Sequence, residues 1–281
     1  MKKYAVAAAL LCASFNTVFA ATVSVAPTMI LEGDPVMLTM QSSSSPKTIT
    51  FDKKLVPSFV YGGTPHALFG IDLKKPAGNY PLTIQFQNGE SIQTTITVAK
   101  RDRPEEPLGI PQKLGGNTTG SQTALVDSLA IENASLAKIY SIGKATWKTP
   151  FIAPVAEPVI TDPYGYDRKT GEYTIAHKGT DFRAPAGTKV TAMNRGVVRI
   201  ARTYRVYGKT IVVDHGLGVH TFYMHLSKIY VNVGELVERG QLIGLSGETG
   251  YAERPHLHVS VHINGIAIDP VKFLALFGAN L

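Results

Sequence analysis

Apolar and polar residues alternate at a period of two in both halves of the chain, and no other feature constrains its fold as much. Leu82, Ile84 and Phe86, for example, alternate with Thr83 and Gln85. A period of two indicates β-strands that bury one face. Further strand-like runs lie at 211–213, 222–226 and 257–263. The sequence therefore predicts an all-β fold.

Residues 21–99 form the first predicted domain. The turn pair Asn88-Gly89 separates two alternating runs, at 82–86 and 92–98, which predicts a hairpin. Short strands and turns over this length fit a small sandwich. His66 is the only histidine of the segment. We therefore interpret it as a spacer or binding module without chemistry of its own.

Residues 100–150 differ in composition and are predicted to be a linker. Residues 101–107 are charged and proline-rich, and residues 115–120 are rich in glycine. A short helix is expected over 121–140, where Leu125, Leu129 and Leu136 recur at near-helical spacing. Glu132 interrupts this apolar stripe. The second domain is expected over 151–281, with strands separated by glycines at turn spacing.

The first twenty residues have the pattern of a secretory signal peptide. Lys2 and Lys3 precede an apolar run at 5–15, and Val18-Phe19-Ala20 offers small residues for cleavage after Ala20. No later stretch reaches the roughly 18 consecutive apolar residues that a transmembrane helix needs. The sequence thus predicts an exported protein, in the periplasm of a Gram-negative host or secreted.

Cys12 is the only cysteine and lies within this predicted signal. Leu11 precedes it, whereas a lipid-attachment cysteine normally follows a small residue, so plain cleavage is favoured. The mature chain would then have no disulfide, and a zinc site would need nitrogen and oxygen ligands. Removal of Lys2 and Lys3 takes the net charge from +7 to +5, and a moderately basic exported protein suits an anionic envelope surface. No basic-aromatic cluster predicts nucleic acid as a partner.

Histidines are concentrated in the last part of the chain, where seven of the eight lie. Because strand side chains alternate, His256 and His258 share one face with Ser260 and His262. The intervening residues are apolar and are expected to face the core. The polar face is expected to line a groove. His262 lies too far along the strand to share a metal with His258 and is interpreted as a bystander.

Two further elements carry candidate ligands or catalytic groups. His177 and Asp181 flank Gly179, and such nitrogen and oxygen donors suit zinc. On a regular strand, His225 shares a face with Tyr223, and His220 falls on the opposite face. His215 is expected at a strand end, with little part in the chemistry.

Two histidines and one aspartate, with water in the fourth position, would form an open catalytic zinc site. The chain has no His-Glu-x-x-His motif, so the base and the oxyanion partner must come from elsewhere. Neutral histidines suit both roles near pH 7, and His225 and His256 are the natural candidates.

These elements, in this order, resemble the LytM/lysostaphin-type zinc endopeptidases, which cleave peptidoglycan. The matching motifs, spread over about 130 residues, are His177–Phe182, Ala184–Thr188, Gly196–Val198, Val213–Gly216, Tyr223–Ser227, Gly240–Gly244, Pro255–His258 and Asp269–Pro270. The resemblance implies one zinc ion, bound by His177, Asp181 and His258. It also implies catalytic roles for His225 and His256, on a largely antiparallel sheet with a narrow groove.

Residues 21–99 look like the immunoglobulin-like domain that precedes this catalytic domain in some members. Two departures from the family pattern bear on substrate preference. Ser260 stands where members often carry glutamate, and residues 251–255 replace a loop that usually reads close to Ser-Thr-Gly-Pro.

The sequence therefore predicts a zinc metalloendopeptidase with peptidoglycan as its partner and substrate. One alternative is a catalytically silent relative that binds or activates other wall hydrolases. Another is a general secreted protease. The sequence does not indicate an oligomeric state.

Overall fold

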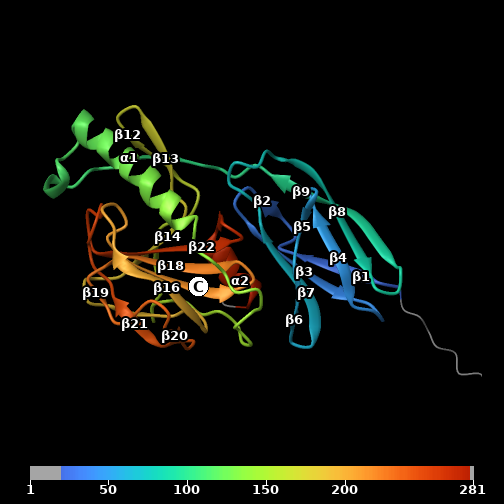
Figure 1. Cartoon of the computed structure of the whole chain (residues 1–281). Helices are drawn as coiled ribbons and strands as arrows, with labels where there is room; N and C mark the ends of the chain where they lie inside the picture. Colours follow the sequence, from blue (N-terminus) through green and yellow to red (C-terminus); the bar gives the residue numbers. More distant parts are fainter. Residues whose placement is uncertain (1–19, 279–281) are drawn as a thin grey trace, which may run out of the picture.

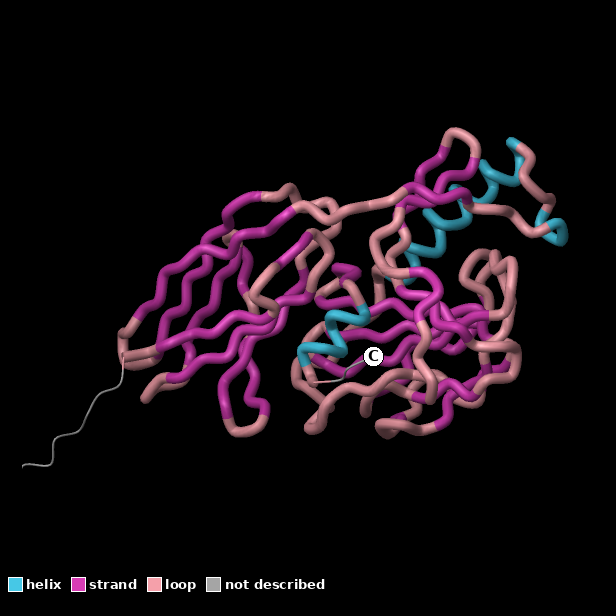
Figure 2. Tube along the Cα trace, turned by 180° about the vertical axis from the view of Figure 1, so that it is seen from behind, coloured by secondary structure: helices cyan, strands magenta, loops and turns pink. Residues whose placement is uncertain are grey.

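The computed structural model describes residues 20–278. The predicted signal peptide and Cys12 lie outside the described residues, apart from Ala20. Two bodies of β-sheet follow one another along the chain, and helices are few (Figures 1 and 2). The predicted all-β class is confirmed. Neither helix of residues 20–278 combines the length and apolarity that a bilayer-spanning helix needs.

The N-terminal body consists of two sheets, which share one hydrophobic core. The predicted hairpin at Asn88-Gly89 is confirmed, because the strands on either side pair antiparallel around it. The first sheet has the order β1 (Thr22–Ala26), β3 (Pro35–Gln41), β7 (Thr64–Gly70) and β6 (Ser58–Tyr61). The second has the order β2 (Ile30–Leu31), β9 (Ser91–Ala99), β8 (Gly78–Phe86), β4 (Pro46–Phe51) and β5 (Lys54–Leu55). Its likeness to an immunoglobulin domain stays a prediction.

The C-terminal body is built on one large antiparallel sheet. Its order is β11 (Ile160–Asp162), β14 (Thr180–Arg183), β22 (His256–Ile263), β18 (Val219–Leu226), β17 (Lys209–Gly216), β16 (Gly196–Thr203) and β20 (Leu236–Val237), with β23 (Ile266–Ile268) paired to β22. A smaller sheet has the order β15 (Lys189–Thr191), β21 (Leu242–Leu245) and β19 (Lys228–Ile229).

The two faces of the large sheet carry different clusters of apolar side chains. Tyr223 and Val259 point into the main core, which also contains Phe273 of helix α2 (Pro270–Leu276). Phe222 and Met224 point to the other face and form a second cluster with Leu136 of helix α1 (Thr119–Leu136). The helices therefore cover opposite faces, and α1 lies over the face that carries the candidate site (Figure 1).

Residues 100–150 pack against the C-terminal body along much of their length. Strand β10 (Glu105–Pro107) pairs with β12 (Asp167–Thr170), which forms a hairpin with β13 (Tyr173–Ala176). A short 3-10 helix, η1 (Gln112–Leu114), precedes α1. Leu125 of α1 is buried against Ile110 and Val206. The helix begins at Thr119, two residues before the predicted start, because the Thr118 side chain caps it by accepting the amide of Ser121. It ends at Leu136, four residues before the predicted end.

Arg101 joins the two bodies through a buried network of charges. Its guanidinium donates to Asp34 of the N-terminal body and, at 3.2 Å, to Asp269 of the C-terminal body. Lys272 also contacts Asp34, at 2.7 Å. The N-terminal body is therefore anchored beside β23 and α2, as Figure 2 shows from behind.

Candidate metal centre and groove

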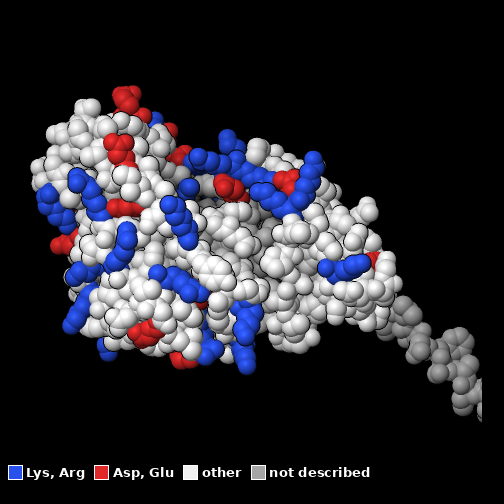
Figure 3. Space-filling view, viewed as in Figure 1, with Lys and Arg blue, Asp and Glu red and all other residues white. Residues whose placement is uncertain are grey.

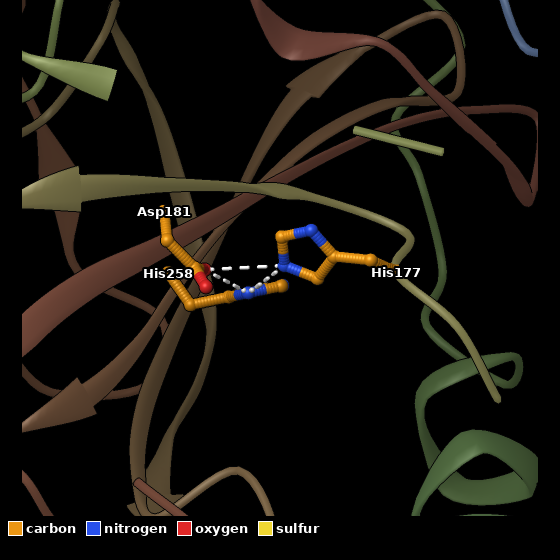
Figure 4. Close-up of side chains that lie close together, drawn as sticks. All are labelled: His177, Asp181 and His258. Atoms are coloured by element: carbon orange, nitrogen blue, oxygen red, sulfur yellow. Dashed lines mark hydrogen bonds and ion pairs between the residues drawn. The ribbon is translucent and has the colours of Figure 1, made fainter. Parts of the chain in front are cut away.

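Three side chains from two elements converge at one end of the large sheet. Asp181 on β14 lies directly opposite His258 on β22, so their side chains share a face. His177 lies in the turn before β14 and reaches the same point (Figure 4). The His258 Nδ1–Asp181 Oδ1 distance is 2.7 Å, and His177 Nε2 lies 3.2 Å from the same oxygen. The three donor atoms lie within 4.8 Å of one another.

Hydrogen bonds on the far sides of both imidazoles set which nitrogen faces this point. His177 Nδ1 donates to the Pro163 carbonyl oxygen at 2.9 Å, so Nε2 keeps its lone pair. Ser260 Oγ donates to the Lys178 carbonyl oxygen and lies 3.0 Å from His258 Nε2. It therefore accepts from Nε2 of His258 and leaves Nδ1 unprotonated. Such outer contacts orient the ligands of protein metal sites.

The protonation states of the group suit a divalent cation. Burial lowers the pKa of His258 to about 4, although the Asp181 carboxylate opposes this shift, so His258 is neutral near pH 7. Burial works to raise the pKa of Asp181, but His177 and His258 outweigh it and hold that pKa well below its usual range. Arg168 also donates to the second carboxylate oxygen at 2.8 Å. Two imidazole nitrogens and a carboxylate oxygen form a donor set that fits zinc.

Gly179 is needed for this close approach. A Cβ atom at position 179 would lie 2.4 Å from Nε2 of His258 and 2.6 Å from the Val259 carbonyl oxygen. Distances that short do not occur between real atoms of this kind, so only glycine fits against the His258 imidazole and the backbone of β22 at this position.

His225 and His256 lie beside this group, with their rings 4.8 Å apart. The His225 ring is 6.0 Å from that of His258, and His256 Nε2 is 3.9 Å from Asp181 Oδ1. Both histidines donate from Nδ1 to backbone carbonyl oxygens, those of Thr249 and Arg254, at 2.8 Å. Their Nε2 atoms therefore remain available to a bound substrate. Burial, followed by the neighbouring histidines, lowers the pKa of His225 to about 3.

The prediction that His225 shares a strand face with Tyr223 is wrong, although the His225 imidazole does lie at the site. Regular alternation groups it with Tyr223, which is fully buried in the main core. The backbone at His225 instead has φ 60°, in the left-handed region that side-chain-bearing residues rarely adopt. It coincides with a register shift between β17 and β18, where Lys209 pairs with Leu226 and Ile211 with Tyr223. Alternation is broken there, and the imidazole lies beside His256 and His258.

The other histidines of the C-terminal body lie outside this group. His215 is fully buried, with Nδ1 2.9 Å from the Arg195 carbonyl oxygen and Nε2 2.8 Å from Thr221 Oγ1. His262 pairs across the strands with His220 and is not among the clustered donor atoms. Its interpretation as a bystander agrees with this placement.

A cavity of about 620 Å³ connects the candidate centre to α1. His177, His225 and His258 line one part of it, and Leu125, Leu129 and Asn133 of α1 line another. The segment predicted as a linker therefore forms a wall of the groove. Sequence reasoning missed the contacts of Arg168 and Glu132, although the polar interruption of the α1 stripe was a signal for the latter.

Fold and site together define a β-sheet protein with a candidate metal centre of the metallopeptidase type. Residues 175–270 match peptidase family M23, and the C-terminal domain is a domain of this family. A crystal structure described as an M23 peptidase from Pseudomonas aeruginosa is similar over 87% of this chain and 94% of that chain, with a TM-score of 0.63 and 27% identity. The similarity therefore extends over both bodies.

Two curated relatives are similar to the C-terminal part. Peptidoglycan DD-endopeptidase ShyA of Vibrio cholerae is 45% identical over 96 residues, which are 34% of this chain and 22% of ShyA. DD-carboxypeptidase/endopeptidase Mpg of Neisseria meningitidis is 37% identical over 122 residues, 43% of this chain and 28% of Mpg. The chain thus spans about a quarter of the length of these relatives.

Proposed function

We propose that the protein is a zinc-dependent endopeptidase that hydrolyses peptide bonds of bacterial peptidoglycan. The observation that carries this proposal is the placement of two imidazoles with free Nε2 atoms, His225 and His256, beside the His177–Asp181–His258 group in one groove. The M23 domain and relatives named peptidoglycan DD-endopeptidases support it. By this analogy, we propose cross-links that contain D-alanine as the substrate.

His177, Asp181 and His258 would hold the zinc ion. Bound zinc would supply Lewis acidity toward the scissile carbonyl and toward the attacking water. Because both rings donate from Nδ1 to backbone carbonyl oxygens, Nε2 of His225 or His256 can accept a proton of the attacking water, and the Nε2–H formed in this way can donate to the developing oxyanion. Ser260 and Pro163 keep the ligand imidazoles in the required tautomers.

We also propose export to the periplasm, where such a substrate lies, after cleavage behind Ala20. Cleavage removes Lys2 and Lys3 and takes the net charge from +7 to +5, which supports an approach to an anionic polymer. Lys and Arg side chains are spread over the face seen in Figure 3 and are not gathered on one element.

Digestion of purified sacculi tests the proposal. Residues 21–281 with zinc should release un-cross-linked muropeptides, detected by mass spectrometry, and should leave casein intact. His258→Ala and Asp181→Ala should lose both zinc and activity, because each removes a ligand. His225→Ala and His256→Ala should retain zinc, measured by elemental analysis, but lose at least about a hundredfold in turnover.

Three outcomes would contradict this assignment. A protein that binds no zinc and remains inactive when zinc is supplied would favour the alternative, a silent relative that binds or activates other hydrolases. Release of peptides from casein but not from sacculi would favour a general protease. Near-full cleavage by His225→Ala would remove His225 from the reaction.

A further inference from the structure

Helix α1 carries a buried carboxylate that reaches out of the helix to a loop of the C-terminal sheet. Glu132 is 6% exposed. Its two oxygens accept three consecutive backbone amides of the loop between β16 and β17. Oε1 accepts Arg205 N at 2.7 Å and Val206 N at 3.0 Å, and Oε2 accepts Tyr207 N at 3.2 Å. Consecutive amides around one anion form a nest.

The stability of the helix does not explain why a buried glutamate occupies position 132. The residue lies near the C-terminal end of α1, where the helix dipole disfavours negative charge. It also interrupts the apolar stripe, and burying a carboxylate is costly unless hydrogen bonds satisfy it. Among the ion pairs of residues 20–278, none involves Glu132. Its partners are the loop amides.

The loop held by Glu132 supports the backbone of His225. The carbonyl oxygen of Tyr207 accepts the backbone amide of His225 at 3.0 Å. The side chain of Tyr207 adds a second tie to α1, because its hydroxyl donates to Asn133 Oδ1 at 2.7 Å.

The same loop also supports the imidazole of His225. The carbonyl oxygen of Val206 accepts the amide of Tyr251 at 2.9 Å, and Lys209 N donates to Thr249 Oγ1 at 2.9 Å. These bonds fix residues 249–251, and the carbonyl oxygen of Thr249 in turn accepts His225 Nδ1. The loop that Glu132 clamps therefore makes one of the two hydrogen bonds that orient His225. It also contributes to the other through Tyr251, together with Lys209 at the start of β17 and the Leu226 carbonyl oxygen, which accepts from Thr249 Oγ1 at 2.7 Å.

His225 needs such support because its backbone is strained. A non-glycine residue at φ 60° persists only where the surrounding structure over-determines it. Without the loop, the residue can relax to an extended conformation, which would return the imidazole to the other face of β18 and away from His256.

We propose that Glu132 is a positioning residue for His225, so that α1 is a working part of the peptidase site rather than a tether between domains. Glu132 touches neither the metal-facing atoms nor the groove histidines and acts through the loop 205–207. The inference rests on the proposed function, in which His225 takes part in hydrolysis.

The test compares Glu132→Gln with Asp127→Asn, both in residues 21–281. Each variant removes one negative charge from α1, but Asp127 is exposed. In Glu132→Gln an amide NH2 group replaces one acceptor and faces the loop amides. We expect kcat on cross-linked muropeptides to fall about 10- to 100-fold, with KM and zinc content unchanged, because a displaced catalytic group mainly affects the chemical step. Asp127→Asn should match the parent protein.

A second readout is independent of activity. Long-range 1H–15N NMR of the zinc-free protein should show His225 as a single Nδ1-protonated tautomer in the parent protein and in Asp127→Asn. In Glu132→Gln, the signals should shift toward a tautomer mixture. Unchanged kcat together with an unchanged His225 signal would overturn the inference. If the parent protein cleaves no muropeptide, the proposed function fails, while the NMR comparison still decides whether Glu132 holds His225.

Two measurements cover the case in which Glu132→Gln does not fold. Glu132→Asp keeps the charge but withdraws the carboxylate by one methylene, and it should show the same two effects. In the parent protein, amide hydrogen exchange at Arg205, Val206 and Tyr207 should be as slow as in β17. Exchange at the rate of an unprotected loop would contradict the inference.

Discussion

His215 shows how differently one residue type is used within a single sheet. Its ring is enclosed by the core, packed edge-on against Phe151 and held at both nitrogens by Arg195 and Thr221. Burial lowers its pKa to about 4. His215 therefore stays neutral in the folded protein over a pH range in which the unfolded chain becomes protonated.

This difference predicts a stability that falls in acid. Between the unfolded pKa, about 6.5, and the folded pKa, only the unfolded chain binds the proton, so the free energy of unfolding decreases as the pH falls. The loss of stability caused by His215 is absent above about pH 6.5 and reaches about 3 kcal/mol by pH 4. His215→Gln can keep both hydrogen bonds but does not titrate. Between pH 7 and pH 4, the free energy of unfolding measured in urea should therefore decrease less for the variant than for the parent protein. Equal decreases would contradict the burial argument.

Sequence reasoning predicts which face of a strand a site residue occupies only where the backbone of that strand is regular. Alternation on β22 places His256 and His258 on one face, and the resemblance to the LytM/lysostaphin-type family selects His258, together with His177 and Asp181, as the ligand set. His225 was placed on the wrong face because alternation presumes extended dihedral angles at every position. The contact of Arg168 with Asp181 could not be predicted, since it depends on where the β12–β13 hairpin folds in space.

At the scale of elements, strands were easier to predict than the role of α1. Alternating runs identified the β8–β9 hairpin because each strand buries one face of its own. The apolar stripe of α1 predicted a helix but not its partner, since Leu125 packs on Val206, which is 81 positions away in the sequence. Long-range packing of this kind leaves no periodic signal.

Two apolar residues of α1 provide a matched test of its packing. Leu125 is 1% exposed, and Ile131 is 72% exposed on the same helix. Leu125→Ala should lower the free energy of unfolding by about 2–5 kcal/mol, as large-to-small core substitutions do. Ile131→Ala should change it by less than about 0.5 kcal/mol. Urea unfolding measures both, and similar small effects would show that α1 contributes little to the C-terminal body.

On the scale of the whole molecule, the charges around Arg101 connect the two bodies next to an apolar contact, in which Met37 and Leu68 of the N-terminal body join the main core of the C-terminal body. Asp34 is completely buried, and Asp269 is nearly so. Burial comes first among the causes that raise the pKa of Asp269, while Arg101 works to lower it. Removal of Arg101 would leave both carboxylates without their shared cation.

Arg101→Met should lower the free energy of unfolding by about 3–5 kcal/mol, the usual cost of breaking a buried pair. We expect calorimetry to show one transition for the parent protein and two for the variant, because the bodies would unfold separately. Arg195→Met is the control, since Arg195 and its partner Glu238 are largely exposed. It should cost less than about 1 kcal/mol. A single transition in Arg101→Met would mean that other contacts couple the bodies.

The register between β14 and β22 also has a consequence for biosynthesis. Asp181 and His258 meet in space but are separated by 77 positions along the chain. When a nascent chain has left the ribosome only as far as Arg254, it contains the imidazole of His177 and the carboxylate of Asp181 but not yet His258. The group of three donors is then incomplete. Translation that stalls or terminates early therefore yields a product without a complete cation site. The three donor atoms of this group cannot come together until nearly the last strand of the chain has been made.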